Sequence, residues 1–146
     1  MQGNVKIKVE SASSFAGMTD VLNFTGTGTL EKTDYGYHLR YTAANDIDGS
    51  VVDSDVKLEQ ATHRAVVINE NGPYGYGLLL DPKATTATRI EAGGGALVLN
   101  VMTREVSWDL GKKQGTIRLD YTLLQGVQPM SALHLRLDLQ QGDTER

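Results

Sequence analysis

Six aromatic side chains fall on the face that alternation along the chain assigns to the interior, and four of them are tyrosines. Buried phenols need hydrogen-bond partners and ring faces offer apolar contact, so these residue types suit a pocket for a small, partly apolar ligand. The same side chains could instead fill a core, with their hydroxyls bonded to one another or to a trapped water. Both interpretations stay open from the sequence. The candidate ligand-binding residues are Phe24, Tyr37, Tyr41, Tyr76, Trp108 and Tyr121.

Two glycines share the inward face of the segment from Asp20 to Glu31 with Phe24. Glycine at an inward strand position indicates either a sharp bend, as at a barrel corner, or a place left open for another group. If Gly26 and Gly28 leave space, we expect a ligand to enter the interior past them.

The sequence offers no catalytic or metal-binding constellation. It has no cysteine and no Gly-x-Ser-x-Gly motif. Its three histidines, His38, His63 and His134, are far apart, and we expect them on different strands, with His38 and His134 facing solvent. Asp53 and Asp55 share one polar strand face, which we expect to be solvated. We therefore expect no cofactor and no metal, and the prediction leans away from an enzyme.

Three glycine- or aspartate-rich segments resemble parts of ligand loops. Asp46, Asp48 and Gly49 fit three positions of a calcium loop, but its first ligand position holds Ala44, so a hairpin turn explains them better. The segments 75–77 and 111–116 resemble fragments of a phosphate loop, but neither joins a strand to a helix. We interpret both as turns and strand glycines.

The charge balance argues against a polyanionic partner. The 146 residues carry a formal net charge of -4 with a pI near 5.3, which lacks the positive excess that nucleic-acid binding requires. No apolar run reaches the ~20 residues of a membrane-spanning helix, and Lys6 and Lys8 interrupt the apolar residues of the first segment. We expect one soluble, cytoplasmic domain over residues 1–146, without nucleic-acid or membrane partners.

Period-two alternation recurs along almost the whole chain and predicts about ten short strands with short connections, hence an antiparallel meander. Closure into a barrel, or a strongly curved two-layer sandwich, would cover the apolar face and remove the sheet edges. The apolar parity changes between Leu97 and Trp108, which predicts a β-bulge between Met102 and Glu105. We expect a frayed tail over Gln140–Arg146 and outward-facing arginines that pair with carboxylates such as Asp120 and Asp138; these arginines are Arg40, Arg104, Arg118 and Arg136.

The order of these patterns resembles the YwiB-like family of small bacterial proteins of unknown function. The resemblance rests on Thr88–Glu91, Gly95–Leu99 and Gly115–Leu123 in the second half, and on Phe24–Gly28, the tyrosine strand 35–41 and the hairpin at 66–72 in the first. One departure is the turn Gly93–Gly95, where a larger residue or proline is expected before the last glycine. The resemblance implies a calycin-like, lipocalin-like barrel and implies no reaction, ligand or catalytic residue.

The leading functional hypothesis is a non-enzymatic barrel that binds a small ligand or regulates another protein. The alternative is a docking module that acts through its outer surface, as a homo-oligomer or with a protein partner, around a filled interior. The volume of any interior cavity separates the two.

Overall fold

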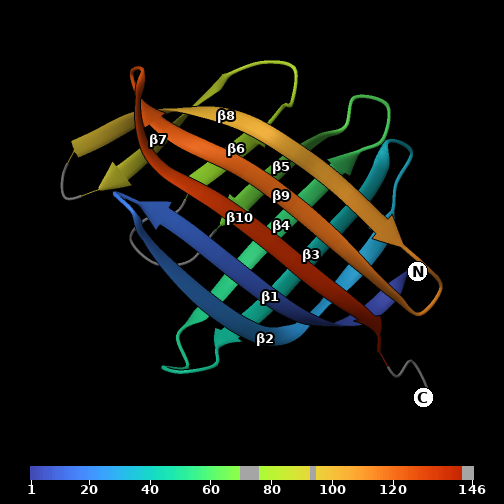
Figure 1. Cartoon of the computed structure of the whole chain (residues 1–146). Helices are drawn as coiled ribbons and strands as arrows, with labels where there is room; N and C mark the ends of the chain where they lie inside the picture. The colour runs from blue at the N-terminus through green and yellow to red at the C-terminus, as the bar shows by residue number, and fades with distance from the viewer. Residues whose placement is uncertain (70–75, 93–94, 143–146) are drawn as a thin grey trace.

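The computed structural model describes residues 1–69, 76–92 and 95–142, and these fold as a nearly closed barrel of ten antiparallel strands without a helix (Figure 1). The fold class expected from alternation is thereby confirmed. The strands are β1 (Gly3–Phe15), β2 (Met18–Lys32), β3 (Gly36–Asn45), β4 (Val51–Glu59), β5 (Arg64–Asn69), β6 (Tyr76–Leu80), β7 (Thr86–Ala92), β8 (Gly95–Leu110), β9 (Gln114–Gln125) and β10 (Gln128–Gln141).

The sheet order is β6-β5-β4-β3-β2-β1-β10-β9-β8-β7. Strands that are neighbours in this order are also consecutive in the chain, except for β1 and β10. The start of β1 and the end of β10 lie at one end of the barrel, on the right of Figure 1, together with the β4–β5 and β8–β9 connections. We call this the termini end. The opposite end carries the β1–β2 and β9–β10 turns, and we call it the hairpin end.

The seam between the first and last strands of the sheet order is closed by threonine side chains. Thr86 Oγ1 donates to the carbonyl of Leu79, and Thr88 Oγ1 donates to the carbonyl of Gly77, both at 2.6 Å. These two bonds link β7 to β6 where the two strands form no ladder. They satisfy backbone acceptors that an open sheet edge would expose.

The interior of the termini end is aliphatic. Val5 and Ile7 alternate with exposed lysines along β1, and each apolar side chain is about 1% exposed. Leu39, Ile117 and Leu137 from other strands are fully buried in the same core. Burial of such side chains contributes about 1.5–3 kcal/mol each, so these residues stabilise the barrel substantially.

Gly26 and Gly28 mark a bend in β2 and leave no open space. A Cβ on Gly26 would lie 1.9 Å from the carbonyl oxygen of Thr42, and one on Gly28 would lie 2.2 Å from that of Arg40. The backbone of β3 therefore occupies the volume that a side chain would need. The expectation of a ligand path past these glycines is wrong, and the bend is the correct alternative.

The ladder between β8 and β9 contains the expected irregularity. Its register shifts between Thr103 and Glu105, which leaves Arg104 as the extra residue of a bulge. This shift lets Thr103 and Val106 both point inward, and both are buried. A second shift, at Met130 in β10, was not expected.

The turns and the C-terminal strand add local detail to the sequence expectations. The hairpin turn expected at Asp48 and Gly49 has a positive φ at Gly49, and the β1–β2 turn has positive φ at Ala16 and Gly17, of 52° and 79°. Strand β10 runs to Gln141, so the tail is ordered further than expected. The Asn71–Pro73 turn, Gly93, Gly94 and residues 143–146 lie outside the described residues.

The arginines that alternation places on the outer face are exposed, as expected: Arg40, Arg104, Arg118 and Arg136.

Within the described ranges, no helix has the length and apolar character needed to cross a membrane.

Candidate functional site

Five of the six candidate aromatics face inward, as alternation predicted. Tyr41 and Tyr121 are buried in the core, at 7% and 5% exposure. Phe24, Tyr37 and Trp108 are partly buried and pack against that core. Tyr76 pairs with Asn69 in the β5–β6 ladder, and its side chain lies outside the described part.

The inward-facing aromatics are spread along the barrel. Tyr37 pairs with Leu58 near the start of β3, at the termini end, and Trp108 lies near the same end of β8. Tyr41 is four residues further along β3, which is about 13 Å at 3.3 Å per residue. That these rings line one ligand site stays a prediction.

Among the described residues, the polar residues of the core lie in the middle of the barrel or toward its hairpin end. Tyr41 pairs with Ser54, and Ser54 pairs with Asn69, so one inward row across β3, β4 and β5 is polar. On the other side of the barrel, Tyr121 of β9 pairs with Thr103 of β8. The buried polar residues are Asn45, Ser54, Thr88 and Thr103. We call the inward-facing group Tyr41, Ser54, Asn69, Thr103 and Tyr121 the polar interior.

Thr103 is the member of the polar interior with an unmet hydrogen-bonding group. The residue is 7% exposed, and its Oγ1 is buried without a hydrogen-bond partner among the described residues. Thr88, which is buried to the same degree, bonds a backbone carbonyl instead. An unpaired buried hydroxyl costs about 1–3 kcal/mol of folding free energy, so we expect a water or a ligand to bond Thr103 Oγ1.

At the termini end, Trp108 is contacted by a loop. His63 of the β4–β5 connection stacks on Trp108 with ring centroids 5.3 Å apart. His63 adopts a φ of 55°, a left-handed conformation that is uncommon for residues other than glycine. It lies in this loop and not on a strand, which corrects the sequence expectation.

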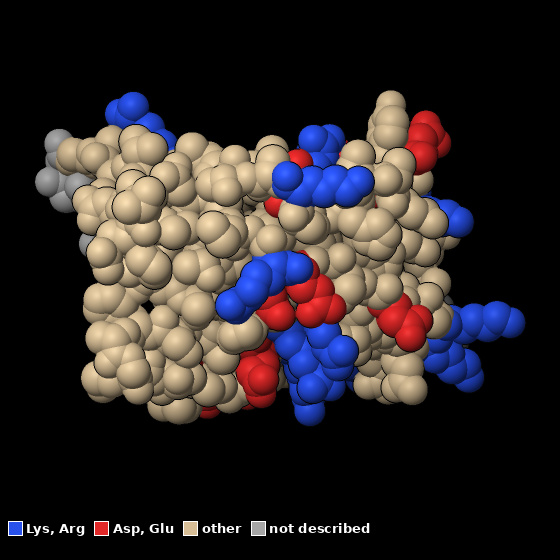
Figure 2. Space-filling view, turned by 45° about the horizontal axis from the view of Figure 1, so that its top comes forward, with Lys and Arg blue, Asp and Glu red and all other residues tan. Residues whose placement is uncertain are grey.

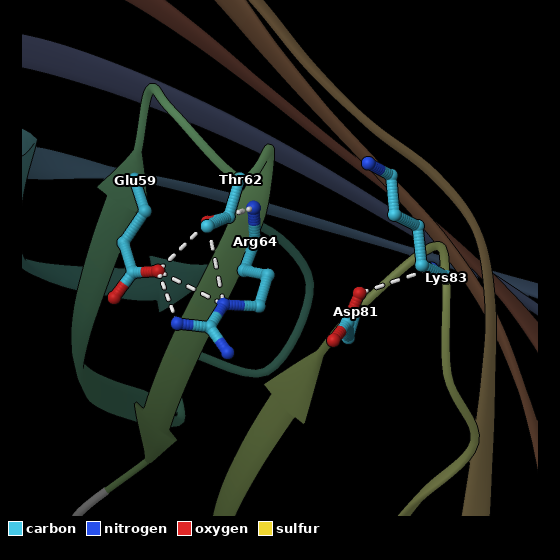
Figure 3. Close-up of polar contacts among 5 residues, drawn as sticks. All are labelled: Glu59, Thr62, Arg64, Asp81 and Lys83. Carbon is cyan, nitrogen blue, oxygen red and sulfur yellow. Dashed lines mark hydrogen bonds and ion pairs between the residues drawn. The ribbon is translucent and has the colours of Figure 1, made fainter.

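The same loop is fixed at its base by a polar network (Figure 3). Glu59 Oε1 accepts from Thr62 Oγ1 at 2.8 Å and from Arg64 Nε at 2.9 Å, joining the last residue of β4 to the first of β5. The Thr62 hydroxyl and the Arg64 guanidinium together hold the pKa of the Glu59 carboxyl below its ordinary value. In the β6–β7 connection, Asp81 accepts from the backbone N–H of Lys83.

The other histidines pair with carboxylates on the outer face. His134 Nδ1 lies 2.9 Å from Asp120 Oδ1, and its side chain is half exposed. The His38 side chain is only 13% exposed and its Nε2 lies 3.6 Å from Asp55 Oδ1, so the expected solvent-facing histidine is largely covered. Asp55 is also partly covered, against expectation, and contacts Arg40.

The residues of the calcium-like loop cap a turn. Asp48 Oδ1 accepts from the hydroxyl and the backbone N–H of Ser50, and these bonds lower the pKa of the Asp48 carboxyl. Asp46 accepts from Thr25 on the neighbouring strand. Among the described residues, no group of three or more histidines and carboxylates is arranged to hold a metal ion.

Hollows bordered by the described residues lie mainly on the outer surface. The first, of about 640 Å³, lies over β8, β9 and β10, and a second, of about 360 Å³, lies over β1 and β2 beside it. A smaller one, of about 220 Å³, reaches Tyr41 and Ser54 from outside. None of these three opens into the polar interior through Thr103 or Tyr121.

Ten antiparallel strands closed around one core, with polar side chains gathered toward one end, define a calycin-like β-barrel. The chain belongs to the family described as "Domain of unknown function (DUF1934)", which matches residues 7–137. The expected family resemblance is thereby confirmed.

The chain is also similar to a solved structure, the ywiB protein from Bacillus subtilis. The two share 20% sequence identity with a TM-score of 0.77, over 97% of this chain and 94% of that one. At this identity the likeness shows the fold alone. No curated protein matches the chain significantly.

Proposed function

We propose that the protein is a non-enzymatic, cytoplasmic barrel that binds a small, partly apolar molecule in its polar interior. Tyr41 and Tyr121 supply ring surface for the apolar part of this molecule. The Thr103 hydroxyl supplies a hydrogen bond to its polar group. The cytoplasmic location is part of the proposal and draws on the absence of cysteine from the chain.

The observation that carries the proposal is the unpaired Thr103 Oγ1. Its neighbour across the ladder is Tyr121, and both side chains are at least nine-tenths buried. A bound molecule that bonds this hydroxyl would remove a desolvation cost, which a purely structural threonine would not carry. Because the hollow beside Tyr41 lies outside the barrel, side chains must move to admit the ligand. Association is then slower than the rate constants of about 10⁵–10⁷ M⁻¹s⁻¹ that are typical of preformed sites.

The test is Thr103→Val, which keeps the branched shape and removes the hydroxyl, with Thr103→Ser as the matched control. Binding is measured by ligand-observed NMR with a panel of simple phenols, indole and medium-chain fatty acids. We expect Thr103→Val to have a free energy of unfolding about 1 kcal/mol higher than that of the natural protein, because an unpaired buried hydroxyl is gone. We also expect Thr103→Val to lose binding of the panel compounds that bind the natural protein, and Thr103→Ser to retain it.

Loss of stability in Thr103→Val, with binding unchanged, would assign the hydroxyl to the fold and overturn the proposal. A second variant addresses the neighbouring ring. Tyr121→Phe should weaken a polar hit by about 0.5–1.5 kcal/mol if the phenol bonds the ligand.

One observation favours the alternative function, docking through the outer surface to a second copy of this chain. Phe15, Met18, Val21 and Leu22 at the hairpin end are 47–72% exposed. The β2–β3 ladder begins at Phe24, and the carbonyl of Asn23 still accepts from Asp46. The backbone groups of the alternate residues Thr19 and Val21 therefore face the side that β3 leaves open.

Such an edge can pair with its own copy around a two-fold axis. Light scattering at increasing concentration tests this. A dimer that Val21→Lys converts to a monomer would support docking, and a monomer at all concentrations would exclude it.

A further inference from the structure

A repeated triplet places two arginines side by side on the outer face. The sequence Arg-Leu-Asp occurs at 118–120 in β9 and again at 136–138 in β10. The central residues, Leu119 and Leu137, are fully buried, so the flanking arginines and aspartates face outward. In the antiparallel register Arg118 lies directly opposite Arg136. Like charges at opposed positions of a sheet destabilise it, so this arrangement needs an explanation.

The neighbouring carboxylates neutralise only one of the two arginines. Asp138 Oδ2 lies 3.2 Å from Arg136 Nε, and Asp138 also accepts from Thr116. Asp120, the corresponding residue of the other triplet, is engaged by His134. Arg118 forms no ion pair or hydrogen bond with any residue in the described ranges. A guanidinium without a counter-ion therefore stands beside a second guanidinium.

The pair borders the hollow of about 640 Å³ described above. The β8–β9 connection forms another wall, where Gly111 and Gln114 line the hollow and the exposed Lys112 and Lys113 lie between them. Asp109 and Asp138 are its carboxylates. The charged residues that line the hollow are therefore two arginines and two aspartates, and of the two arginines only Arg118 has no counter-ion in the described ranges.

The charge on this side of the molecule is localised. Figure 2 shows Lys, Arg, Asp and Glu crowded toward the centre and right of the face, while its left part is almost free of them. The right side is the termini end, where the β8–β9 connection lies. Positive and negative side chains are interleaved there, so the attraction for an anion comes from the unpaired guanidinium of Arg118 beside that of Arg136.

We propose that this hollow binds the phosphate group of a small molecule, held between the guanidinium groups of Arg118 and Arg136. Two adjacent guanidinium forks present parallel N–H donors that match the oxygens of a phosphate. A phosphate can neutralise Arg118 and still accept from the guanidinium N–H groups of Arg136 that Asp138 does not engage, whereas a monocarboxylate has fewer oxygens to bridge the two forks. The net charge of -4 opposes a long polyanion, which restricts the ligand to a small one. The site is separate from the polar interior.

The experiment titrates the full chain with inorganic phosphate, pyrophosphate and phenyl phosphate, followed by calorimetry and ³¹P NMR at low ionic strength. Acetate is the monoanion arm. Saturable binding of the phosphates, at least about tenfold tighter than acetate, is the expected result. Binding of acetate as tightly as phosphate, or no saturation by any phosphate up to about 10 mM, a free energy of only about -2.7 kcal/mol, would overturn the proposal.

Matched variants assign the binding to the arginine pair. Arg118→Gln and Arg136→Gln should each weaken phosphate binding by about tenfold or more, and Arg118→Lys should weaken it less. Arg40→Gln is the control, because Arg40 is an equally outward arginine on β3 that already faces Asp55. Without phosphate, Arg118→Gln should fold at least as stably as the natural protein, since it removes the like-charge pair. Equal phosphate affinity in Arg118→Gln and Arg40→Gln would show that the pair is not the site.

Discussion

His63, in the connection between β4 and β5, stacks on Trp108 of β8 with an interplanar angle of 29°. The loop that carries His63 joins β4 to β5, which are not neighbours of β8 in the sheet, so the stack links distant parts of the barrel at the termini end. The Glu59–Thr62–Arg64 network holds the base of this loop. This end is therefore closed by a specific contact, while the polar interior lies toward the opposite end.

The left-handed backbone at His63 gives the first prediction. His63→Ala loses the ring contact and keeps the strained φ of 55°, so it should be less stable than the natural protein by about 0.5–1.5 kcal/mol. His63→Gly loses the same contact and relieves the strain, so it should exceed the alanine variant by about 1 kcal/mol. Urea unfolding measures both. Alanine and glycine variants of equal stability would contradict the strain argument, and unchanged Trp108 emission in both would contradict the stack.

The bend in β2 gives the second prediction. Gly28→Ala places a Cβ against the β3 backbone, which cannot yield as a side chain does, and should cost about 3 kcal/mol or more. Gly77→Ala is the control, because its Cβ would meet only Ile68 Cγ1 at 4.0 Å. Thermal or chemical unfolding compares the two variants. If both lose the same small amount of stability, β3 does not fill the space beside Gly28.

The threonine seam gives the third prediction. Thr88→Val leaves the carbonyl of Gly77 without its 2.6 Å partner and should destabilise the barrel by about 1–2 kcal/mol. It should also speed hydrogen exchange in β6 and β7. Thr29→Val, on the outer face of β2, is the control and should change the free energy of unfolding by less than about 0.5 kcal/mol. Equal effects would mean that the seam does not depend on this bond.

Alternation predicted the strands because each outward residue is polar and each inward residue apolar over most of the chain. The parity change between Leu97 and Trp108 even located the bulge that orients Thr103. The role of Gly26 and Gly28 could not be predicted, since the same residue type serves a bend and an opening. Only the position of the β3 backbone decides between them.

The candidate site was predictable in part for a similar reason. Alternation shows that Tyr37 and Tyr41 face inward, but it does not show that Tyr41 lies between Gly28 and Ser54. The contact of His63 with Trp108 joins a loop to a strand far away in sequence, and nothing in local patterning signals it. The opposed position of Arg118 and Arg136 follows from the register of β9 and β10, which the sequence alone leaves undetermined.

The lowered pKa of the Glu59 carboxyl gives the fourth prediction. A carboxyl whose pKa falls on folding stabilises the folded state above the ordinary value of 4.5, and this contribution is lost as pH drops through the lowered pKa. Glu59 and Arg64 are more than a third exposed, so Glu59→Gln should cost only about 0.3–1 kcal/mol at pH 7.

The difference between the natural protein and Glu59→Gln should shrink as the pH of the unfolding experiment is lowered toward 3. Glu31→Gln is the control, because Glu31 forms no ion pair with the residues described. A difference that stays constant from pH 7 to pH 3 would show that the Glu59 charge does not support the loop.

A high-resolution crystal structure of the protein, purified with its bound molecules, tests whether a ligand occupies the polar interior. We expect density for a non-protein molecule in contact with Tyr121, with a polar atom about 2.7–3.2 Å from Thr103 Oγ1. The contrary result is an interior filled by side chains, with Thr103 Oγ1 bonded to a protein atom and no bound molecule beside it.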